Sequence, residues 1–348
     1  MTLKNCTLRG VLPTVAAFVA FFFAYSCKKD AAIDPVSNPA AKEGAINLST
    51  LIASASAQTN VKFVYKVKIT SPISLTGAKN LTISGDSING GSVPCINLTN
   101  CSNIRITHCK LVNSKTLGIN LSGCTNVMID SNYVSNVSTG VYAVNSKTIQ
   151  VAYCQMRNMQ GPYPRGAFVQ FDNVSGAYNR VSHNRFENML GASYPEDAIS
   201  MYKSNGIATD PILITDNWIR GGGPSKTGGG IMLGDNGGSY QTASYNTLVN
   251  PGQYGMAVSG GAKMQIIGNK IYSKAQSFSN VGLYYWNQSG LSSSAITISG
   301  NRVNFSSLSY GLNNLFLGSG NTAPTGWSSN TYDATLNASI LPATIITY

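Results

Sequence analysis

The sequence has little charge, and acidic residues and histidines are especially scarce. Only 11% of its 348 residues are charged, with 13 Asp and Glu, 24 Lys and Arg and two His. In contrast, it has 35 glycines together with many Asn, Ser and Thr residues, which are typical of tight turns. The composition therefore disfavours a helical bundle and indicates a β-rich protein. The length allows one large domain or two ordinary ones.

Metal-binding and nucleic-acid-binding patterns are also missing. The seven cysteines include no CxxC pair and are not accompanied by paired histidines, so they form neither a zinc pattern nor a disulfide framework. No basic run with interleaved aromatic residues occurs, and we expect no nucleic-acid partner. The net charge of +11 falls to about +9 without the first 26 residues, which favours a polyanion as partner, an acidic polysaccharide or lipopolysaccharide, with general solubility as the alternative.

A long apolar span is absent from the N-terminus as well. Lys4 and Arg9 precede the apolar run VAAFVAFFFAY, which is too short to cross a membrane comfortably and predicts a secretory signal over residues 1–26. Cys27 follows a small residue, and the sequence SCKKD resembles the lipobox of Bacteroidetes-type bacterial lipoproteins. The resemblance implies export, lipidation of Cys27 and a membrane anchor in the outer membrane, on its periplasmic side or at the cell surface. An ordinary signal cleaved elsewhere is the alternative.

The rest of the chain divides into a tether and one repeat domain. Residues 27–45 are rich in Ala, Pro, Ser and Lys without periodicity, as expected of a flexible tether. We assign residues 46–348 to a single domain. Within it, Asn47 to Ala57 predicts a short helix that caps the first coil, and Asn321 to Tyr348 predicts a cover over the last.

A repeat with one fixed frame fills most of this domain. Segments such as NLTISGDSI, NVMIDSNYV, MQIIGNKI and ITISGNRV place an apolar strand residue two positions before a turn residue. The next position is taken by Asp86, Cys109, Asn132, Cys154, Asn184, Asn217, Asn246, Asn269 and Asn301, at intervals of 22 to 33 residues. About 22 residues is one coil of a parallel β-helix. Stacked coils would align these side chains as an internal amide ladder, in which a small Cys replaces Asn.

With these repeats the chain resembles the right-handed parallel β-helix superfamily, the pectate-lyase-like fold, over residues 61–316. The fold class predicted is therefore all-β, a single-stranded right-handed parallel β-helix with an N-terminal helical cap. The superfamily contains lyases, hydrolases, epimerases and non-enzymatic proteins, so the resemblance does not fix a reaction.

A second strand follows each ladder strand and presents one outer face. Alternation places Asn120 and Ser122 outward, and the same phase predicts two outward columns. The first contains Tyr142, Phe168 or Gln170, Ser200, Met232 and Tyr284, and the second contains Tyr202, Gly234 and Trp286. Long insertions lie between ladder and second strand on successive coils, in RNMQGPYPRG, ENMLGASYPED and RGGGPSKTGGG. We expect these loops to wall a groove over that face. We expect the substrate-binding residues to be Gln170, Tyr284, Trp286 and Tyr142.

Charged residues concentrate beside this predicted groove, and two reactions fit them. In β-elimination on a uronate polymer, Lys203 or Tyr202 would be the base and Arg165 would neutralise the substrate carboxylate. Glu196, Asp197, Asp172 or Asp235 would hold Ca²⁺ or orient the base, and among them Asp172 and Asp235 are the metal ligands that we expect. In glycoside hydrolysis, a pair drawn from Asp172, Glu196, Asp197 and Asp235 would act instead. By resemblance we favour a polysaccharide lyase acting on an acidic polysaccharide.

Two further classes stay open, a glycan-binding lipoprotein without activity and a purely structural surface solenoid. Each of the acids could also simply bond turn amides. His108 and His183 fall at a turn on another side of the coil and are expected to be exposed. We expect a monomer.

Overall fold

The computed structural model describes residues 65–348, apart from 289 and 291–292. The described residues belong to a compact unit that spans residues 46–348. The signal segment, Cys27, the tether and the helix predicted at 47–57 lie outside the described residues, so these features stay predictions. The described residues contain no helix long and apolar enough to cross a membrane.

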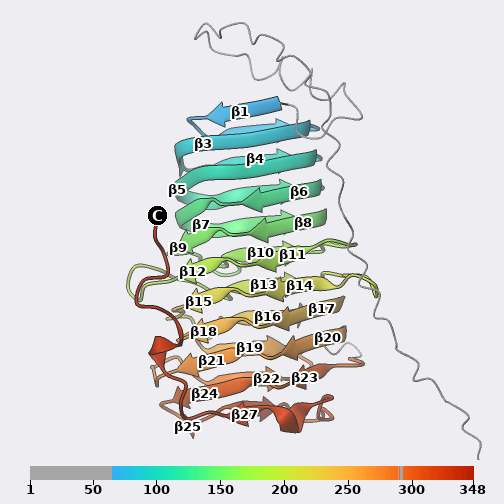
Figure 1. Ribbon diagram of the computed structural model, residues 1–348, viewed down its shortest axis with the longest axis vertical. Helices are drawn as coiled ribbons and strands as arrows, with labels where there is room; N and C mark the ends of the chain where they lie inside the picture. The colour runs from blue at the N-terminus through green and yellow to red at the C-terminus, as the bar shows by residue number, and fades with distance from the viewer. Residues whose placement is uncertain (1–64, 289, 291–292) are drawn as a thin grey trace, which may run out of the picture. The chain divides into compact units, whose positions relative to one another are not determined.

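The chain winds through successive coils, and each coil adds a strand to three stacks, which we name faces A, B and C (Figure 1). Face A contains β2 (Ile73–Thr76), β4 (Ile96–Thr99), β10 (Val169–Asp172), β13 (Ile199–Tyr202), β16 (Ile231–Asp235), β19 (Tyr254–Val258), β22 (Val281–Tyr285) and β26 (Leu315–Leu317). Face B contains β1 (Tyr65–Ile69), β6 (Thr125–Asp130), β8 (Lys147–Ala152), β11 (Arg180–Ser182), β14 (Ile212–Thr215), β17 (Ser239–Ser244), β20 (Ala262–Ile267) and β23 (Thr297–Ser299). Face C contains β9 (Gln155–Arg157), β12 (Arg185–Glu187), β15 (Trp218–Arg220), β18 (Thr247–Val249), β21 (Lys270–Ser273), β24 (Arg302–Ser307) and β27 (Thr331–Tyr332).

Three long strands bend around the corners and join these faces. They are β3 (Lys79–Gly91), β5 (Ser102–Ser122) and β7 (Tyr133–Val144). Among the strands described, each pairing is parallel except that of β24 with the short β25 (Gly311–Leu312). The architecture is therefore the parallel β-helix that the repeats predict.

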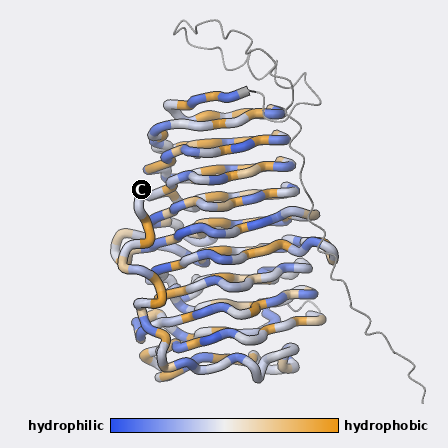
Figure 2. The backbone as a smooth tube through the Cα atoms, in the orientation of Figure 1, coloured by the Kyte–Doolittle hydropathy of each residue, from blue (hydrophilic) through white to orange (hydrophobic). Residues whose placement is uncertain are grey.

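The core lies inside the coils because each strand alternates apolar and polar residues. Figure 2 shows this alternation as orange and blue segments along every coil. Residues in register on successive coils stack directly upon each other, and one fully buried stack contains Ile83, Ile106, Ile129, Val151, Val181, Ile214, Ala243, Ile266 and Ile298. Burying one Val, Leu or Ile side chain of this kind contributes about 1.5–3 kcal/mol to the stability of the fold.

The internal amide ladder is present from Asn132 onward. The Asn217 Nδ2 atom donates to Asn246 Oδ1 at 2.9 Å, and Asn269 repeats the bond to Asn301 at 2.9 Å. Each amide oxygen also accepts a hydrogen bond from the backbone N–H of the preceding ladder residue; for example, the Asn217 N–H donates to Asn246 Oδ1 at 3.1 Å. The ladder thus satisfies buried polar groups at these corners that would otherwise destabilise the fold.

Cysteines complete the ladder where Asn is missing. Cys109 and Cys154 are buried with free thiols, and the backbone N–H of Cys154 donates to Asn184 Oδ1 at 2.9 Å. Burial raises the pKa of both thiols to about 12, so they stay protonated and unreactive. Their predicted structural role agrees with this placement.

The ladder differs from the prediction at both ends. Asp86 is not a ladder residue, because strand β3 shifts register around Gly85 and turns it outward. It is exposed there, with its carboxylate 2.8 Å from the Lys68 ammonium, which avoids the large cost of burying a charge. At the other end Asn330 extends the ladder beyond the predicted positions, accepting from Asn301 Nδ2 at 2.7 Å.

The C-terminal segment, predicted as a cover over the last coil, divides in two. Its first part adds a partial coil with η1 (Trp327–Ser329) and β27, and Trp327 packs on the main core. After Asp333 the chain contains η2 (Ala338–Ile340) and runs back along face C towards earlier coils (Figure 1). Leu341, Ile345 and Ile346 pack there on Val249, and the ring of Tyr348 stacks on Tyr133 with centroids 4.8 Å apart.

Candidate active site

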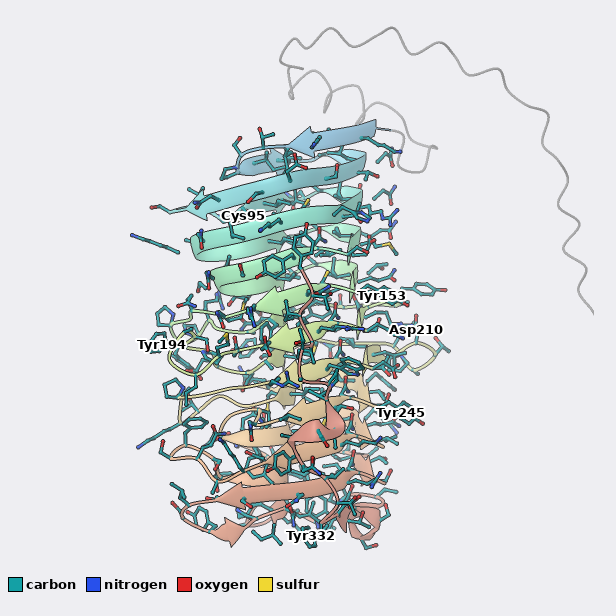
Figure 3. All side chains as sticks on the ribbon, turned by 60° about the vertical axis from the view of Figure 1, so that its left-hand side comes forward. Cys95, Tyr153, Tyr194, Asp210, Tyr245 and Tyr332 are labelled. Carbon is teal, nitrogen blue, oxygen red and sulfur yellow. The ribbon has the colours of Figure 1, made fainter. Side chains whose placement is uncertain are left out.

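Inserted loops wall a groove over face A, as the sequence predicts. The connections from face C to face A are long on three successive coils, at residues 158–168, 188–198 and 221–230, whereas residues 250–253 suffice on the next. Tyr194, on the second of these loops, projects on the side opposite Tyr153 and Tyr245 (Figure 3). The groove has a volume of about 710 Å³ and lies over β10, β13 and β16.

Most of the predicted site residues line this groove. They are Arg165, Gln170, Asp172, Glu196, Asp197, Tyr202, Asp235 and Tyr284. Three predicted residues do not line it, namely Tyr142, Lys203 and Trp286. Phe168, the alternative to Gln170 in the outward column, is a fully buried core residue. The groove thus gathers all four acids that the hydrolase and metal interpretations use.

Asp197 is the most perturbed acid in the groove. The Tyr254 hydroxyl and the Gly229 backbone N–H both donate to its Oδ1 atom, the latter at 3.1 Å. Burial raises the pKa of Asp197 to about 7, with a further increase from the charges of Asp235 and Glu196, while the two hydrogen bonds oppose the rise. Both described hydrogen bonds reach Oδ1, which leaves Oδ2 to carry a proton. A carboxyl group that is part protonated near neutral pH suits general acid–base catalysis.

Asp235 reaches the groove through an irregularity in β16. Register shifts between β13 and β16 bring Asp235 opposite Tyr202, where simple alternation predicts Gly234. Gly234 has a φ of +64°, and a Cβ atom there would lie 2.1 Å from the Gly260 carbonyl oxygen, so only glycine fits. Burial, and then the charge of Asp172, raises the pKa of Asp235, partly offset by the Ser200 hydroxyl.

Asp172 and its neighbours form a second polar group in the groove. The Tyr142 hydroxyl donates to Asp172 Oδ2 at 2.6 Å, and the Arg165 guanidinium lies 3.9 Å from the centre of the Tyr142 ring. Arg165 also donates from Nη1 to Gln170 Oε1 at 3.1 Å. Burial, followed by the hydrogen bond to Asp172, raises the pKa of Tyr142 to about 12. Tyr142 does not line the groove itself, but it contacts Asp172 and Arg165, which do, and so helps to fix the positions of their side chains.

Glu196 is engaged with the loop that forms one wall. Ser225 Oγ donates to its Oε1 at 2.8 Å and Thr227 Oγ1 to its Oε2 at 2.7 Å. With both oxygens occupied, Glu196 holds the 221–230 loop in place. We therefore interpret Glu196 as a residue that positions the wall loop and not as a catalytic acid or base.

Tyr202 is part of the groove lining, whereas Lys203 is not. Lys203 follows β13 with a φ of +48°, is exposed, and its Nζ lies 5.2 Å from the centre of the Tyr202 ring, outside the groove lining. Tyr202 lines the groove, and its hydroxyl accepts a hydrogen bond from Asn236 Nδ2 at 2.8 Å. The predicted base role would accordingly fall to Tyr202 on geometric grounds.

Aromatic residues continue the groove floor beyond the acids. Tyr284 lies in the groove with its ring edge-on to Tyr254 at 5.1 Å. Trp286 lies past the groove lining, is 45% exposed and contacts the equally exposed Phe316 at 6.4 Å between ring centroids. The two rings extend the outer face towards the last coils.

The predicted calcium site is not formed as a cluster. In the described part of the chain, no group of three or more Cys, His, Asp or Glu side chains comes together in a way that could hold a metal ion. Asp172 and Asp235 are separated in register by Tyr202, which is two strand spacings or about 10 Å. The Ca²⁺ requirement stays a prediction.

Sequence reasoning missed several groove residues. Lys226 and Thr227 belong to a wall loop that the insertion pattern located without assigning its residues, and Gln253 and Gln288 follow no repeat position. Tyr254, the partner of Asp197, stands 57 residues later in the chain. The turn histidines lie elsewhere, as expected: His183 stacks on the exposed Tyr153 with centroids 5.0 Å apart.

A family described as the right-handed β-helix region matches residues 71–241. The fold is therefore the right-handed parallel β-helix predicted from the repeats. No curated protein matches the chain.

Solved structures with detectable likeness come from proteins of different kinds. The tailspike protein of Acinetobacter baumannii phage AM24 has 13% identity and a TM-score of 0.49, covering 73% of this chain and 47% of that one. DFA-IIIase from Arthrobacter chlorophenolicus A6 has 13% identity, a TM-score of 0.44, and coverage of 76% and 71%. The Streptococcus pneumoniae surface protein and adhesin PfbA has 11% identity, a TM-score of 0.42, and coverage of 69% and 67%. The chain spans about half the length of the tailspike protein.

Proposed function

We propose that the groove over face A hydrolyses glycosidic bonds in a polysaccharide. The observation that carries this proposal is the meeting of four carboxyl groups in one groove, one of which, Asp197, has its pKa raised to about 7. Glycoside hydrolysis needs a carboxylic acid that protonates the leaving oxygen and a second carboxylate that acts as base or nucleophile. The groove supplies both kinds of group.

Asp197 is the proposed acid and Asp235 the proposed second carboxylate. Asp235 exerts the strongest charge effect on Asp197 among the neighbouring acids. Glu196 is already occupied by two hydroxyl groups of the wall loop. Asp172 accepts from Tyr142 and would help to hold the sugar with Arg165 and Gln170.

The charge balance of the groove favours hydrolysis over β-elimination. Four acids face only two cations, Arg165 and Lys226, whereas a uronate polymer brings a negative charge on each acidic sugar. Lys203, the first candidate for the eliminating base, lies outside the lining.

Lyase activity on a uronate polymer is the second candidate. One observation favours it, since Tyr202 lines the groove and its hydroxyl accepts a hydrogen bond from Asn236 at 2.8 Å. A Tyr base needs its oxygen within hydrogen-bonding reach of the proton that it removes. Arg165 and Lys226 would then face the substrate carboxylate.

One experiment separates these candidates. The chain from residue 28 onward is incubated with neutral glycans, alginate, pectate, glycosaminoglycans and glucuronans, with and without Ca²⁺. Release of reducing ends without unsaturated product indicates hydrolysis, and ultraviolet absorbance of the unsaturated sugar indicates elimination. Neither signal on any polymer would exclude both reactions and leave glycan binding or a structural role. Asp235→Asn should abolish hydrolysis.

The remaining expectations from the sequence are proposals too. We propose that the protein is exported as a monomer and anchored in the outer membrane through a lipid on Cys27. The support is the SCKKD sequence after the apolar run. Metabolic labelling with a fatty acid should mark the wild-type chain and not Cys27→Ser.

A further inference from the structure

Two of the five described cysteines lie opposite each other on adjacent coils. Ser102 pairs with Thr125 in strands β5 and β6, and the Thr125 N–H donates to the Cys101 carbonyl oxygen at 2.9 Å. Cys101 and Cys124, each one residue earlier, therefore stand in register. They are 23 residues apart in the chain, so stacking of the coils brings them together although no short cysteine motif does.

The spacing of the coils suits a bond between these two cysteines. Parallel neighbours in a sheet are about 4.8 Å apart, and the Cα atoms of a disulfide lie about 4.4–6.8 Å apart. Disulfide formation between Cys101 and Cys124 would therefore leave the pairing of the coils in place.

Both side chains enter the same buried corner and contact each other as thiols. Cys101 is 1% exposed and Cys124 is fully buried. The Cys101 Sγ lies 3.6 Å from the Leu75 carbonyl oxygen, and the Cys124 Sγ lies 3.4 Å from that of Leu98. A hydrogen bond between the two side chains lowers the pKa of Cys101 and, together with burial, raises that of Cys124. The two sulfur atoms thus face each other across one coil spacing.

The other described cysteines have no cysteine opposite them. Cys109 and Cys154 share a corner, but Asn132 lies between them: the Cys109 N–H donates to Asn132 Oδ1 at 2.9 Å, and Asn132 Nδ2 is 3.9 Å from the Cys154 Sγ. Two coil spacings are about 10 Å, which is beyond the reach of a disulfide. Cys95 stands at the other end of β4, opposite Gly118 of the next coil. The geometry therefore singles out one pair.

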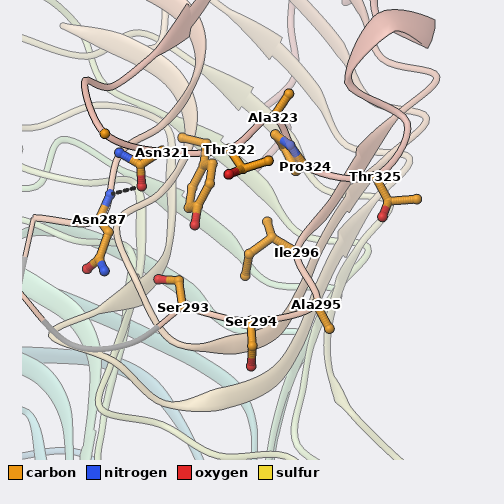
Figure 4. Close-up of a pocket in the computed structure, with 12 residues that line it drawn as sticks. Asn287, Ser293, Ser294, Ala295, Ile296, Asn321, Thr322, Ala323, Pro324 and Thr325 are labelled. Carbon is orange, nitrogen blue, oxygen red and sulfur yellow. Dashed lines mark hydrogen bonds between the residues drawn. The ribbon is translucent and has the colours of Figure 1, made fainter.

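The position of this pair in the stack gives the bond a purpose. The end coils of a solenoid are its weakest part, because each contacts a neighbour on one side only. Near the C-terminal end, the Asn287 N–H donates to Asn321 Oδ1 on the next coil at 3.2 Å (Figure 4). Cys101 follows β4 and Cys124 follows β5, close to the opposite end of the stack (Figure 1). A covalent bond there would tie the first coils together.

We propose that Cys101 and Cys124 form a disulfide that fastens the coil of β4 to the next coil in an oxidising compartment. The oxidant is a disulfide, either that of a protein or glutathione disulfide. The thiolate of one cysteine attacks it, a mixed disulfide forms, and one thiol leaves. The thiolate of the second cysteine then attacks the mixed disulfide, which forms the Sγ–Sγ bond and releases the second thiol. The exchange takes place before the coils close, because both thiols are buried afterwards. It is independent of any reaction in the groove.

Thiol counting tests the proposal. The chain from residue 28 onward contains the compact unit 46–348 and five cysteines. It is reduced in denaturant and refolded with glutathione and glutathione disulfide, and its free thiols are titrated in guanidinium chloride. We expect three free thiols, two fewer than the five of the reduced chain, and an intact mass without bound glutathione. Five free thiols, or glutathione adducts in place of the disulfide, would overturn the proposal.

Two serine variants identify the pair. Serine fits this corner, because Ser146 occupies it one coil after Cys124 and its Oγ accepts from the Cys124 N–H at 3.0 Å. Cys101→Ser should therefore fold and keep all four of its thiols free. Cys95→Ser is the matched control, which should form the disulfide and keep two thiols free. A disulfide that persists in Cys101→Ser or disappears in Cys95→Ser would mean that another pair forms.

Thermal denaturation provides a second readout. The wild-type chain refolded with glutathione disulfide should melt about 3–6 °C above the same chain refolded under reducing conditions, because the bond restricts the unfolded chain. The two preparations of Cys101→Ser should melt at the same temperature. A disulfide that forms without raising the melting temperature of the wild type would show that it does not fasten the coils.

Discussion

The phenol of Tyr254 donates a hydrogen bond to the carboxylate of Asp197, although 57 residues separate them in the chain. The contact spans coils, because Tyr254 begins β19 while Asp197 precedes β13. Burial raises the pKa of Tyr254 well above its ordinary value, so the phenol remains a donor throughout the pH range in which Asp197 titrates. Asp197 is thereby held in one orientation whether or not it is protonated.

Asp197→Asn should change the pH dependence of stability in a defined direction. The pKa of Asp197 rises from 3.8 to about 7 on folding, so the folded state binds more protons, and stability falls as pH increases between about 4 and about 7. A rise of about three units corresponds to about 4 kcal/mol, an upper limit for this effect. Asn cannot ionise, so thermal denaturation should show a gain of about 2 °C or more relative to wild type at about pH 8, and none at about pH 4. An equal effect at both pH values would contradict the raised pKa.

Tyr254→Phe should shift the pH–rate profile of the groove reaction. The Tyr254 hydroxyl lowers the pKa of Asp197 by stabilising the charged form, and its loss should raise that pKa further. Because the proposed acid works when protonated, the alkaline limb of the profile should move to higher pH by about half a unit to one unit. The measurement is kcat/KM against pH on the glycan that the wild type cleaves. Tyr153→Phe, at a 62% exposed residue outside the groove, is the matched control, and an unmoved limb would remove Asp197 from the role of acid.

Asn217→Ala should test the amide ladder. The Asn217 side chain donates to the Val181 carbonyl at 2.8 Å and to Asn246 Oδ1, and it accepts from Asn184. Alanine would leave buried partners unsatisfied, at a cost of about 2–4 kcal/mol in the free energy of unfolding. Asn173→Ala removes the solvent-exposed amide bond to Asn145 and should cost less than about 0.5 kcal/mol. Urea denaturation measures both, and equal costs would show that the ladder is not a special source of stability.

The fold could be predicted from the sequence because the ladder frame repeats on every coil and each coil makes local contacts with the next. The repeat frame gave a wrong position for Asp86, predicted in the ladder, and for Gly234, predicted in the outward column, because a strand shifts register at each of these points. A two-residue periodicity does not reveal such a shift, although in both cases a glycine stands at or beside it. At Asp86 the sequence itself contained a signal of the shift, because a charged side chain does not fit a buried stack of neutral amides.

The candidate site was predicted only in part. Insertions located the groove, because a longer connection at a fixed corner must leave the coil at that corner. They could not reveal that Tyr254 reaches Asp197 or that Glu196 is occupied by Ser225 and Thr227. Those contacts depend on side-chain directions between loops. The contact of the C-terminal segment with Tyr133 could not be predicted either, because the apolar residues of this segment could pack on several faces of the coil.

Trp286→Ala should separate binding of long chains from binding of short ones. Tyr284 in the groove stands in register with Phe316 on the next coil, and Trp286 contacts Phe316. The two rings therefore continue the groove floor by one coil, or about 4.8 Å. A polysaccharide long enough to leave the groove at this end would stack on them, whereas a short oligosaccharide would not.

The Trp286→Ala variant should therefore raise KM for the polymer about three- to tenfold with little change in kcat, and leave KM for the shortest cleaved oligosaccharide unchanged. Tyr332→Ala, at a 54% exposed residue of face C, controls for loss of surface aromatics in general. An equal increase of KM for the polymer and the shortest oligosaccharide would mean that Trp286 acts on the groove itself and that the substrate does not extend along the solenoid.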